Sequence, residues 1–130
     1  GDEIDLGTVV LGSVKGDMHD IGKNLVGMMM EAAGFKIIDL GVDVDTETFI
    51  AAIREHRADL VLMSALLTTT MTAMQKSVTA IKAQELKTLI LVGGAPVTQL
   101  FADTIGADGY SDDAPGAVNI GRQLIGSVRA

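Results

Sequence analysis

The sequence predicts an α/β domain of five βα units, wound on both faces of a parallel sheet with strand order 2-1-3-4-5. Along the 130 residues, apolar runs of four to seven residues alternate with segments of helical periodicity. Five such units joined by right-handed crossovers most simply give a doubly wound sheet of this order. No linker-like segment or internal repeat interrupts the pattern, so we expect a single domain over residues 1–130.

The first two units cover residues 8 to 57. The first predicted strand is Thr8–Val14, and the following helix is expected to end at Gly34, because glycine readily forms a left-handed C-cap. The second strand is Lys36–Leu40, after which Asp45 caps a helix running to about Arg57. The predicted inner faces are Leu25, Met28, Met29 and Ala32 in the first helix and Phe49, Ile50 and Ile53 in the second.

The third unit supplies the centre of the sheet. Leu60–Ser64 is apolar until its last residue, as expected for a parallel strand that is buried on both faces. A helix is predicted near Thr70–Gln84, and its apolar periodicity gives it one buried face. That face is predicted to contain Met71, Met74, Val78 and Ile81.

The last two units are shorter. The fourth strand, Leu89–Val92, leads into Gly93-Gly94, and a short helix begins around Thr98. The fifth strand is Asp108–Tyr110. Pro115 lies in the first turn of the last helix, where a missing N–H is tolerated. The inner stripe of this helix is predicted to be Ala114, Ala117, Val118, Gly121, Ile125 and Val128.

The composition excludes several classes of function. A net charge of −7 and 3% aromatic residues argue against a nucleic-acid surface, which needs clustered Lys and Arg and often stacking rings. No run approaches the ~18 to 20 apolar residues of a membrane span. The absence of cysteine excludes thiolate zinc sites and disulfides. We therefore expect a cytoplasmic protein whose partners are a small molecule and other proteins, with no nucleic acid and no membrane.

The stretch Lys15–Asn24, which follows the first strand, concentrates the chemistry of the chain. It places Asp17 two residues before His19, and a neutral imidazole can bind a metal through one nitrogen while the other donates to a carboxylate. One histidine cannot complete a zinc site, which needs three or four protein ligands. The other ligands would therefore belong to a bound molecule such as a macrocycle. In the alternative interpretation, Asp17 caps the next helix and His19 is a surface residue.

Two further unusual stretches follow the third and fourth strands. Ser64–Thr70 is rich in hydroxyl groups, and Gly93-Gly94 is a pair of glycines. The carboxyl ends of parallel strands meet at one edge of a sheet, so these stretches should share a rim with Lys15–Asn24. The sequence thus predicts a ligand site at this edge.

The three stretches resemble, in order, the motifs of a known family. Gly16–Asn24 matches D-x-H-x-x-G, Ser64-Ala65-Leu66 matches S-x-L, and Gly93-Gly94 matches G-G. The chain is therefore similar to the cobalamin-binding, Rossmann-like (flavodoxin-like) domain. Methionine synthase shares this domain with the corrinoid proteins of methanol, methylamine and methoxyaromatic methyltransferase systems. The resemblance runs from about residue 8 to residue 123. Seven residues precede the first strand, so the N-terminal helical cap domain of such carriers is expected to be absent.

The resemblance implies a cobalamin or related cobamide bound base-off and His-on, with His19 as the lower axial ligand of cobalt. In this mode the nucleotide base of the cofactor leaves the cobalt and is buried in the protein. Asp17 resembles the hydrogen-bond partner of the imidazole, and Ser64 resembles the next member of the same relay. The residues expected to contact the cofactor are Asp17, Met18, His19, Asp20, Ile21, Gly22, Ser64, Leu66, Thr68, Gly93, Gly94 and Tyr110.

Several of these residues have alternative interpretations. Leu66 and Thr68 match positions that line the slot for the nucleotide tail, and Gly93-Gly94 would let the tail pass close to the backbone. Tyr110 could pack on the base of the tail or be an ordinary half-buried tyrosine. Lys23 is expected to be solvated at the start of the helix. Asp20 is expected either to contact the cofactor or to be solvated there as well. Thr69 and Thr70 could equally cap the third helix.

The predicted function is that of a methyl carrier. A corrinoid-binding protein of this kind accepts a methyl group from one methyltransferase subunit and gives it to another, and a reductive activase is a further expected partner. No catalytic group beyond the relay of Asp17, His19 and Ser64 is predicted, so the chemistry would occur at the bound cobalt.

Other classes of protein share parts of this pattern. The cobalamin-binding subunit of an adenosylcobalamin mutase and a cobalamin-dependent sensor remain alternatives. A phosphoacceptor receiver domain needs an aspartate after the third strand, where Ser64 stands, so that class is excluded. A flavodoxin needs a phosphate-binding loop after the first strand, and Asp17 and Asp20 would repel phosphate there.

Overall fold

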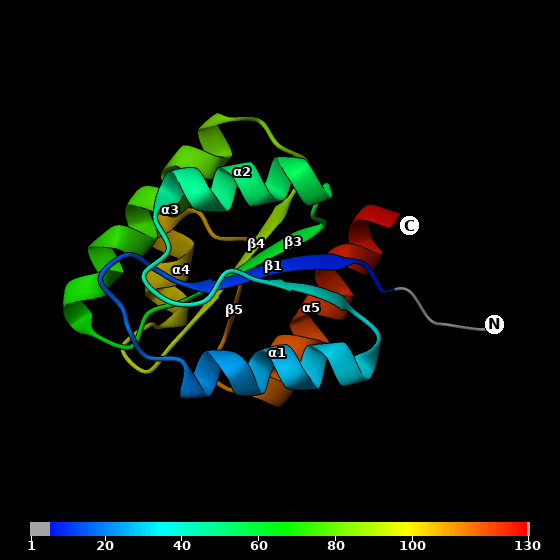
Figure 1. The fold of residues 1–130 in the computed structure, drawn as a ribbon, viewed down its shortest axis with the longest axis horizontal. Helices are drawn as coiled ribbons and strands as arrows, with labels where there is room; N and C mark the ends of the chain where they lie inside the picture. The colour runs from blue at the N-terminus through cyan, green and yellow to red at the C-terminus, as the bar shows by residue number, and fades with distance from the viewer. Residues whose placement is uncertain (1–5, 130) are drawn as a thin grey trace.

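Residues 6–129, which the computed structural model describes, form three layers (Figure 1). The strands are β1 (Thr8–Ser13), β2 (Lys36–Asp39), β3 (Leu60–Ser64), β4 (Leu89–Gly93) and β5 (Gly109–Ser111). The helices are α1 (Ile21–Ala33), α2 (Thr46–His56), α3 (Met71–Ala83), α4 (Gln99–Ile105) and α5 (Ala114–Arg129), with a 3₁₀ turn at Thr68–Thr70. Within this range the strands form one parallel sheet of order β2-β1-β3-β4-β5, which confirms the predicted fold class and strand order.

An apolar core lies on each face of the sheet, between the strands and the helices that cover them. Phe49 of α2, Met74 of α3 and Ala102 of α4 pack on one face of the sheet. Met30 of α1 and Ile125 of α5 pack on the other face. In Figure 1, α2 and α3 accordingly lie above the sheet and α1 lies below it, while α5 begins beside α1 and rises toward the C-terminus. The three central strands are buried on both sides, as their continuous apolar runs require.

The ends of the helices follow local sequence signals. α1 ends at Gly34, whose φ of 116° is left-handed, as predicted. Asp45 Oδ1 accepts hydrogen bonds from the Thr48 N–H at 2.9 Å and from the Thr48 hydroxyl at 2.7 Å. These bonds hold the pKa of Asp45 below its usual value, because they favour the charged carboxylate. Asp45 is therefore the N-cap of α2, as the sequence predicts.

Some predicted boundaries are off by one or two residues. β1 stops at Ser13, since Val14 forms only an isolated bridge with Val44. β2 ends before Leu40, and β5 starts after Asp108. Strand ends are hard to place because the hydrogen-bonding partner, which the local sequence does not reveal, decides where pairing stops.

The inner face predicted for α1 is wrong except at Met29, which packs, partly buried, against the core. Met30 is fully buried, whereas Leu25 and Met28 are 51% and 69% exposed and Ala32 is also exposed. Three consecutive methionines leave the phase of the helix undetermined, because any of them can begin an apolar stripe. The stripe predicted for α5 is correct except at Val128, which is exposed. Despite these apolar surface positions, no helix of the described residues has the length and apolar character needed to cross a membrane.

Candidate functional site

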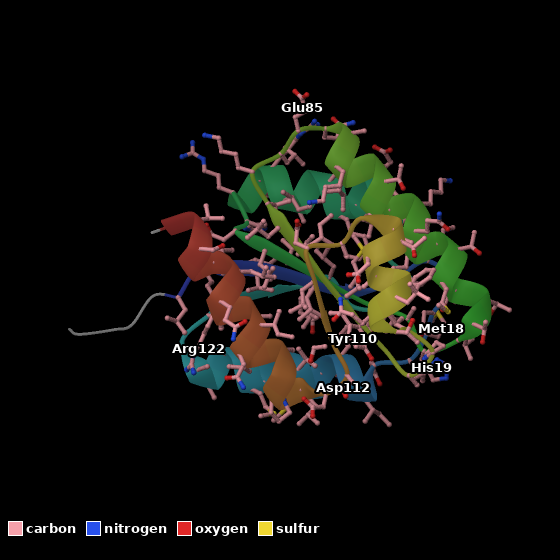
Figure 2. All side chains as sticks on the ribbon, turned by 180° about the vertical axis from the view of Figure 1, so that it is seen from behind. Met18, His19, Glu85, Tyr110, Asp112 and Arg122 are labelled. Atoms are coloured by element: carbon pink, nitrogen blue, oxygen red, sulfur yellow. The ribbon has the colours of Figure 1, made fainter. Side chains whose placement is uncertain are left out.

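The carboxyl ends of the central strands form one rim, where the predicted functional stretches meet. In the sheet, Ser13 pairs with Ser64, and Ser64 pairs with Gly93. The loop that carries His19 follows β1 directly. Figure 2 shows Met18 and His19 together at this edge and Glu85, in the turn after α3, at the opposite one. The fold thus brings the three stretches together, as predicted from their positions after strands.

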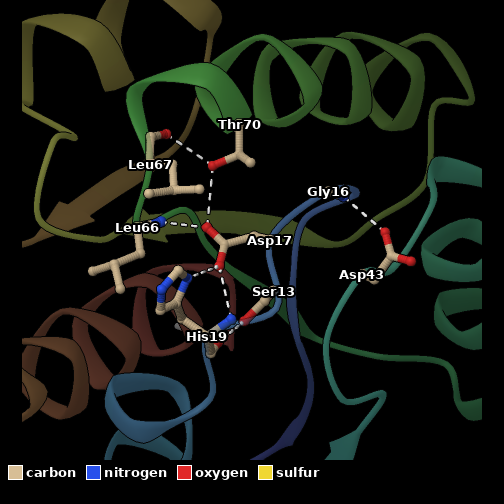
Figure 3. Close-up of polar contacts among 8 residues, drawn as sticks. All are labelled: Ser13, Gly16, Asp17, His19, Asp43, Leu66, Leu67 and Thr70. Atoms are coloured by element: carbon tan, nitrogen blue, oxygen red, sulfur yellow. Dashed lines mark hydrogen bonds and ion pairs between the residues drawn. The ribbon is translucent and has the colours of Figure 1, made fainter.

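Asp17 is the buried centre of the loop after β1. Its side chain is 1% exposed. Oδ1 accepts a hydrogen bond from the His19 backbone N–H at 3.0 Å and lies 3.1 Å from His19 Nδ1. Oδ2 accepts from the Leu66 N–H at 2.5 Å and from the Thr70 hydroxyl at 3.1 Å (Figure 3). One carboxylate therefore ties the loop after β1 to the segment after β3.

The charge on Asp17 determines how the His19 ring is held. Burial raises the pKa of Asp17, but the hydrogen bonds from Leu66, His19 and Thr70 outweigh burial, so this pKa lies below its ordinary value. An ionised carboxylate only accepts hydrogen bonds, which assigns the imidazole proton to Nδ1 and leaves the lone pair on Nε2. The His19 side chain is 51% exposed, and no described residue hydrogen-bonds Nε2. Nε2 is therefore available as a ligand.

The hydroxyl that donates to Asp17 belongs to Thr70 and not to Ser64, the predicted member of the relay. Thr70 is buried, and its Oγ1 lies 2.8 Å from the Leu67 carbonyl as well as 3.1 Å from Asp17 Oδ2. Thr70 precedes α3 but makes no side-chain capping bond there. Ser64 ends β3 and Thr70 follows it closely, so their order in the sequence could not indicate which hydroxyl reaches Asp17.

A pocket of about 370 Å³ opens beside His19, between α1, α5 and the ends of β3 and β4. Much of its wall is aliphatic. The predicted site residues that line it are His19, Gly22, Ser64, Leu66, Gly93 and Gly94. The residues that sequence reasoning missed include Val26, Leu62, Leu91, Ser111, Asp112 and Ala117. The apolar ones look like ordinary core residues of strands and helices, and Ser111 and Asp112 had no signal except their position at and just after the end of β5, on the same rim.

The remaining predicted contact residues do not line the pocket. Asp17 lies behind the His19 ring, on the buried side. Tyr110 packs, partly buried, against the core under α2, α3 and α4, so the alternative of a half-buried tyrosine describes its position. The next residue along β5, Ser111, faces the pocket instead. The exposed residues of this group are Met18, Asp20, Ile21 and Thr68.

The paired glycines are required by contacts within the protein. A Cβ at Gly93 would lie 2.8 Å from the Ser111 carbonyl oxygen. A Cβ at Gly94, whose φ is +128°, would overlap the Ala65 carbonyl oxygen. Gly94 therefore lets the loop after β4 approach the loop after β3 more closely than any side chain allows. Both glycines also line the pocket.

Lys23 is buried, so the interpretation of this residue as solvated is wrong. It is 3% exposed and lines the pocket wall from the first turn of α1. Its Nζ lies 2.8 Å from both carboxylate oxygens of Asp39 and 2.7 Å from Asn24 Oδ1. The ion pair with the end of β2 thus allows an ammonium group to be buried here.

Replacing Asp39 with alanine should destabilise the fold by about 1.5 kcal/mol, because the buried Lys23 ammonium keeps only Asn24 as a partner. Adding Lys23→Met should recover most of this loss by removing the charge itself. Urea unfolding of the single and double variants measures both effects. Lys82→Met, at a more exposed pair with Asp108, is the control and should cost no more than about 0.5 kcal/mol. A double variant no more stable than Asp39→Ala would contradict this role of the pair.

The site suits a metal that arrives inside a larger molecule. Among residues 6–129, no three His, Asp or Glu side chains are grouped so that they could hold a metal ion. His19 offers one nitrogen of a fixed, half-exposed ring at the mouth of a pocket of about 370 Å³. These features fit a macrocyclic metal cofactor with a tail.

Known proteins resemble this chain closely. A family model described as the B12 binding domain matches residues 7–119. A corrinoid protein of Desulfitobacterium hafniense is 47% identical over 122 residues, which cover 92% of this chain and 56% of that protein. Dimethylamine corrinoid protein 3 of Methanosarcina mazei is 42% identical over 122 residues, which cover 92% of this chain and 73% of that protein. The chain thus spans little more than half the length of the first of these relatives.

Solved structures agree with these matches. The methanol:cobalamin methyltransferase complex MtaBC from Methanosarcina barkeri aligns with a TM-score of 0.88 and 34% identity, over 93% of this chain and 47% of that chain. The receiver domain of the putative response regulator NarL from Mycobacterium tuberculosis, at 19% identity and a TM-score of 0.69, shares the fold alone. The family-model match and the identities to the corrinoid proteins show that this chain belongs to the B12-binding domain family.

Proposed function

We propose that this domain binds cobalamin or a related cobamide in the base-off, His-on mode. His19 Nε2 would be the lower axial ligand of cobalt, and the nucleotide tail would enter the pocket beside it. One observation carries this proposal: buried Asp17 holds the His19 ring through Nδ1 at the mouth of a pocket of about 370 Å³. Membership of the B12-binding domain family supports the same class of cofactor.

The residues around His19 would control its strength and direction as a ligand. A hydrogen bond from Nδ1 to an ionised carboxylate makes the imidazole a better donor and fixes the orientation of its ring. Leu66 and Thr70 donate to Oδ2 and hold the carboxylate in place, so the ring keeps its contact with Oδ1 only in the orientation seen here. Ser64, which is not bonded to Asp17, is left with its hydroxyl on the pocket wall for the cofactor.

We further propose that the domain is the corrinoid-binding part of a methyl carrier. The bound cobalt would supply the site that accepts and releases the methyl group, while residues of this chain bind the corrinoid and orient it. Methyltransferase subunits would be the partners, with a reductive activase as an additional one. The names of the dimethylamine corrinoid protein and of the methanol:cobalamin methyltransferase complex support this role. None of these relatives favours a mutase subunit or a sensor.

The protein should retain an equimolar amount of corrinoid when it is mixed with hydroxocobalamin and desalted, and Asp17→Asn should weaken that binding by about 10-fold to 100-fold. The amide keeps the size of the side chain but removes the charge that supports the imidazole. Equilibrium dialysis followed by visible absorbance measures the affinity. Asp45→Asn makes the same substitution at the N-cap of α2 and is the control. Its affinity for the corrinoid should equal that of the unmodified protein.

Two results would contradict the proposal at different points. Loss of all corrinoid from the unmodified protein on desalting would contradict the binding function. Equal affinities of Asp17→Asn and Asp45→Asn would leave binding intact but remove the role of Asp17. The carrier role has a separate test: corrinoid-loaded protein, incubated with extract of its source cells and an isotope-labelled methyl donor, should acquire the label on the protein-bound corrinoid.

A further inference from the structure

We infer that the pocket selects cobamides by the chemistry of the lower base, accepting benzimidazole bases and disfavouring purine bases. This inference rests on the proposed function, because it concerns the part of the cofactor that enters the pocket. The base is the distal end of the nucleotide tail. With His19 on the cobalt at the mouth, the base would reach the floor, and the ribose and phosphate would lie nearer the rim.

The floor of the pocket is aliphatic. Leu62 and Leu91 pair with each other across β3 and β4, two residues before the strand ends, and are 4% and 1% exposed. Val26 of α1 and Ala117 of α5 line the pocket from the side of the helices. None of these four side chains carries a hydrogen-bonding group. The backbones of the two leucines belong to the sheet ladder, and those of Val26 and Ala117 belong to helices. A base at this depth therefore meets aliphatic side chains from the sheet and from both helices.

The polar groups of the pocket lie closer to the rim, and most already have partners. The Lys23 ammonium is paired with Asp39 and Asn24. Ser111 Oγ donates to the Asp113 carbonyl at 2.6 Å, and Asp113 Oδ1 accepts from the Gly116 N–H at 2.7 Å. Ser64, at the end of β3, and exposed Asp112, just after β5, keep polar groups for a ligand. Both stand where the ribose would pass, and both can hydrogen-bond its hydroxyl groups.

The two classes of base differ in the groups that this floor would cover. Benzimidazole and adenine have similar size and shape. The six-membered ring of benzimidazole carries only carbon, whereas that of adenine carries two nitrogens and an exocyclic amine. Against an aliphatic floor these groups would lose water and gain no partner, and each group left unpaired lowers affinity by about tenfold or more. We therefore expect adeninylcobamide to bind about 100-fold more weakly than cobalamin, whose base is dimethylbenzimidazole.

The test is a comparison of dissociation constants for cobalamin and adeninylcobamide, measured by equilibrium dialysis with visible absorbance on the same preparation of protein. A ratio of about 100 in favour of cobalamin is expected. Tight and equal binding of both cobamides would overturn the inference and leave the proposed function standing. Binding of neither would overturn the proposed function and the inference with it. The readout is binding, so no partner methyltransferase is needed.

A pair of variants on α1 makes the test sharper. Val26→Gln places an amide, with a donor and an acceptor, at the floor of the pocket and should narrow the ratio by about tenfold. Met28→Gln introduces the same side chain at a position that is 69% exposed and outside the pocket lining, and should leave the ratio unchanged. Both constants come from one preparation, so a partly misfolded fraction cancels in the ratio. Identical ratios for the two variants would contradict the assignment of Val26 to the floor.

Discussion

Replacing His19 with alanine should remove the protein-derived nitrogen from the coordination shell of bound cobalt and weaken corrinoid binding by at least about 100-fold. The expectation follows from the free Nε2 of a ring that buried Asp17 holds in place. The cobalt(II) form of the cofactor has an unpaired electron, so its magnetic resonance spectrum reports the axial nitrogen. In protein labelled with ¹⁵N-histidine, the splitting should be that of ¹⁵N. A nucleotide base retained on the cobalt would give the splitting of ¹⁴N.

The second histidine of the chain provides a matched control. His56 lies at the end of α2, and its Nε2 is 3.8 Å from Glu55, so it belongs to another part of the molecule. His56→Ala should keep both the affinity and the ¹⁵N splitting. A ¹⁴N splitting in the labelled, unmodified protein would contradict the His-on mode even if the corrinoid is tightly bound.

Replacing Gly94 with alanine should destabilise the fold by about 3 kcal/mol or more, because the new methyl group meets the Ala65 carbonyl oxygen in a left-handed backbone conformation. The tip of a flexible side chain could move aside, but the Ala65 carbonyl belongs to the backbone and cannot move without shifting the loop after β3. That loop carries the Leu66 N–H that holds Asp17. Urea unfolding followed by circular dichroism should therefore show a large loss of stability, and the corrinoid affinity should fall with it.

Two other glycines separate the causes of this effect. Gly106 is also left-handed, with a φ of +87°, but has open space around its Cβ position, so Gly106→Ala should cost only about 1 kcal/mol. Gly126 lies in α5 with neither constraint, and Gly126→Ala should stabilise the helix by about 0.5 to 1 kcal/mol. If Gly94→Ala lowers the free energy of unfolding no more than Gly106→Ala does, the contact with Ala65 does not constrain the loop.

The fold could be predicted because its signals are local and repeated. Each buried central strand is a short apolar run, and α1, α2 and α4 have capping residues such as Gly34 and Asp45. The phase of α1 could not be predicted, because Met28 and its two methionine neighbours satisfy several inner faces equally well. The burial of Lys23 could not be predicted either, because its partner Asp39 lies in a different element, at the end of β2.

The candidate site was predictable in its position and less so in its detailed contacts. His19 and Asp17 lie two residues apart, so their contact follows from a short loop. The partner of Asp17 across the rim depends on how two distant segments turn, and it proved to be Thr70. Tyr110 lies on a strand of three residues, too short for alternation to show which face it takes. The floor of the pocket had no chemical signal because it is made of ordinary core residues.

The hydrogen bonds of Asp17 have a consequence for the order in which the protein is made. Its partners Leu66 and Thr70 stand 49 and 53 residues later in the chain. A nascent chain that has left the ribosome only as far as α2 contains the complete D-x-H-x-x-G motif but lacks the groups that fix Asp17. The geometry of His19 therefore matures only after β3 has been synthesised and has paired with β1. Uptake of a corrinoid that depends on this geometry would therefore wait for the pairing of β3 with β1, and synthesis of the motif alone would not be enough.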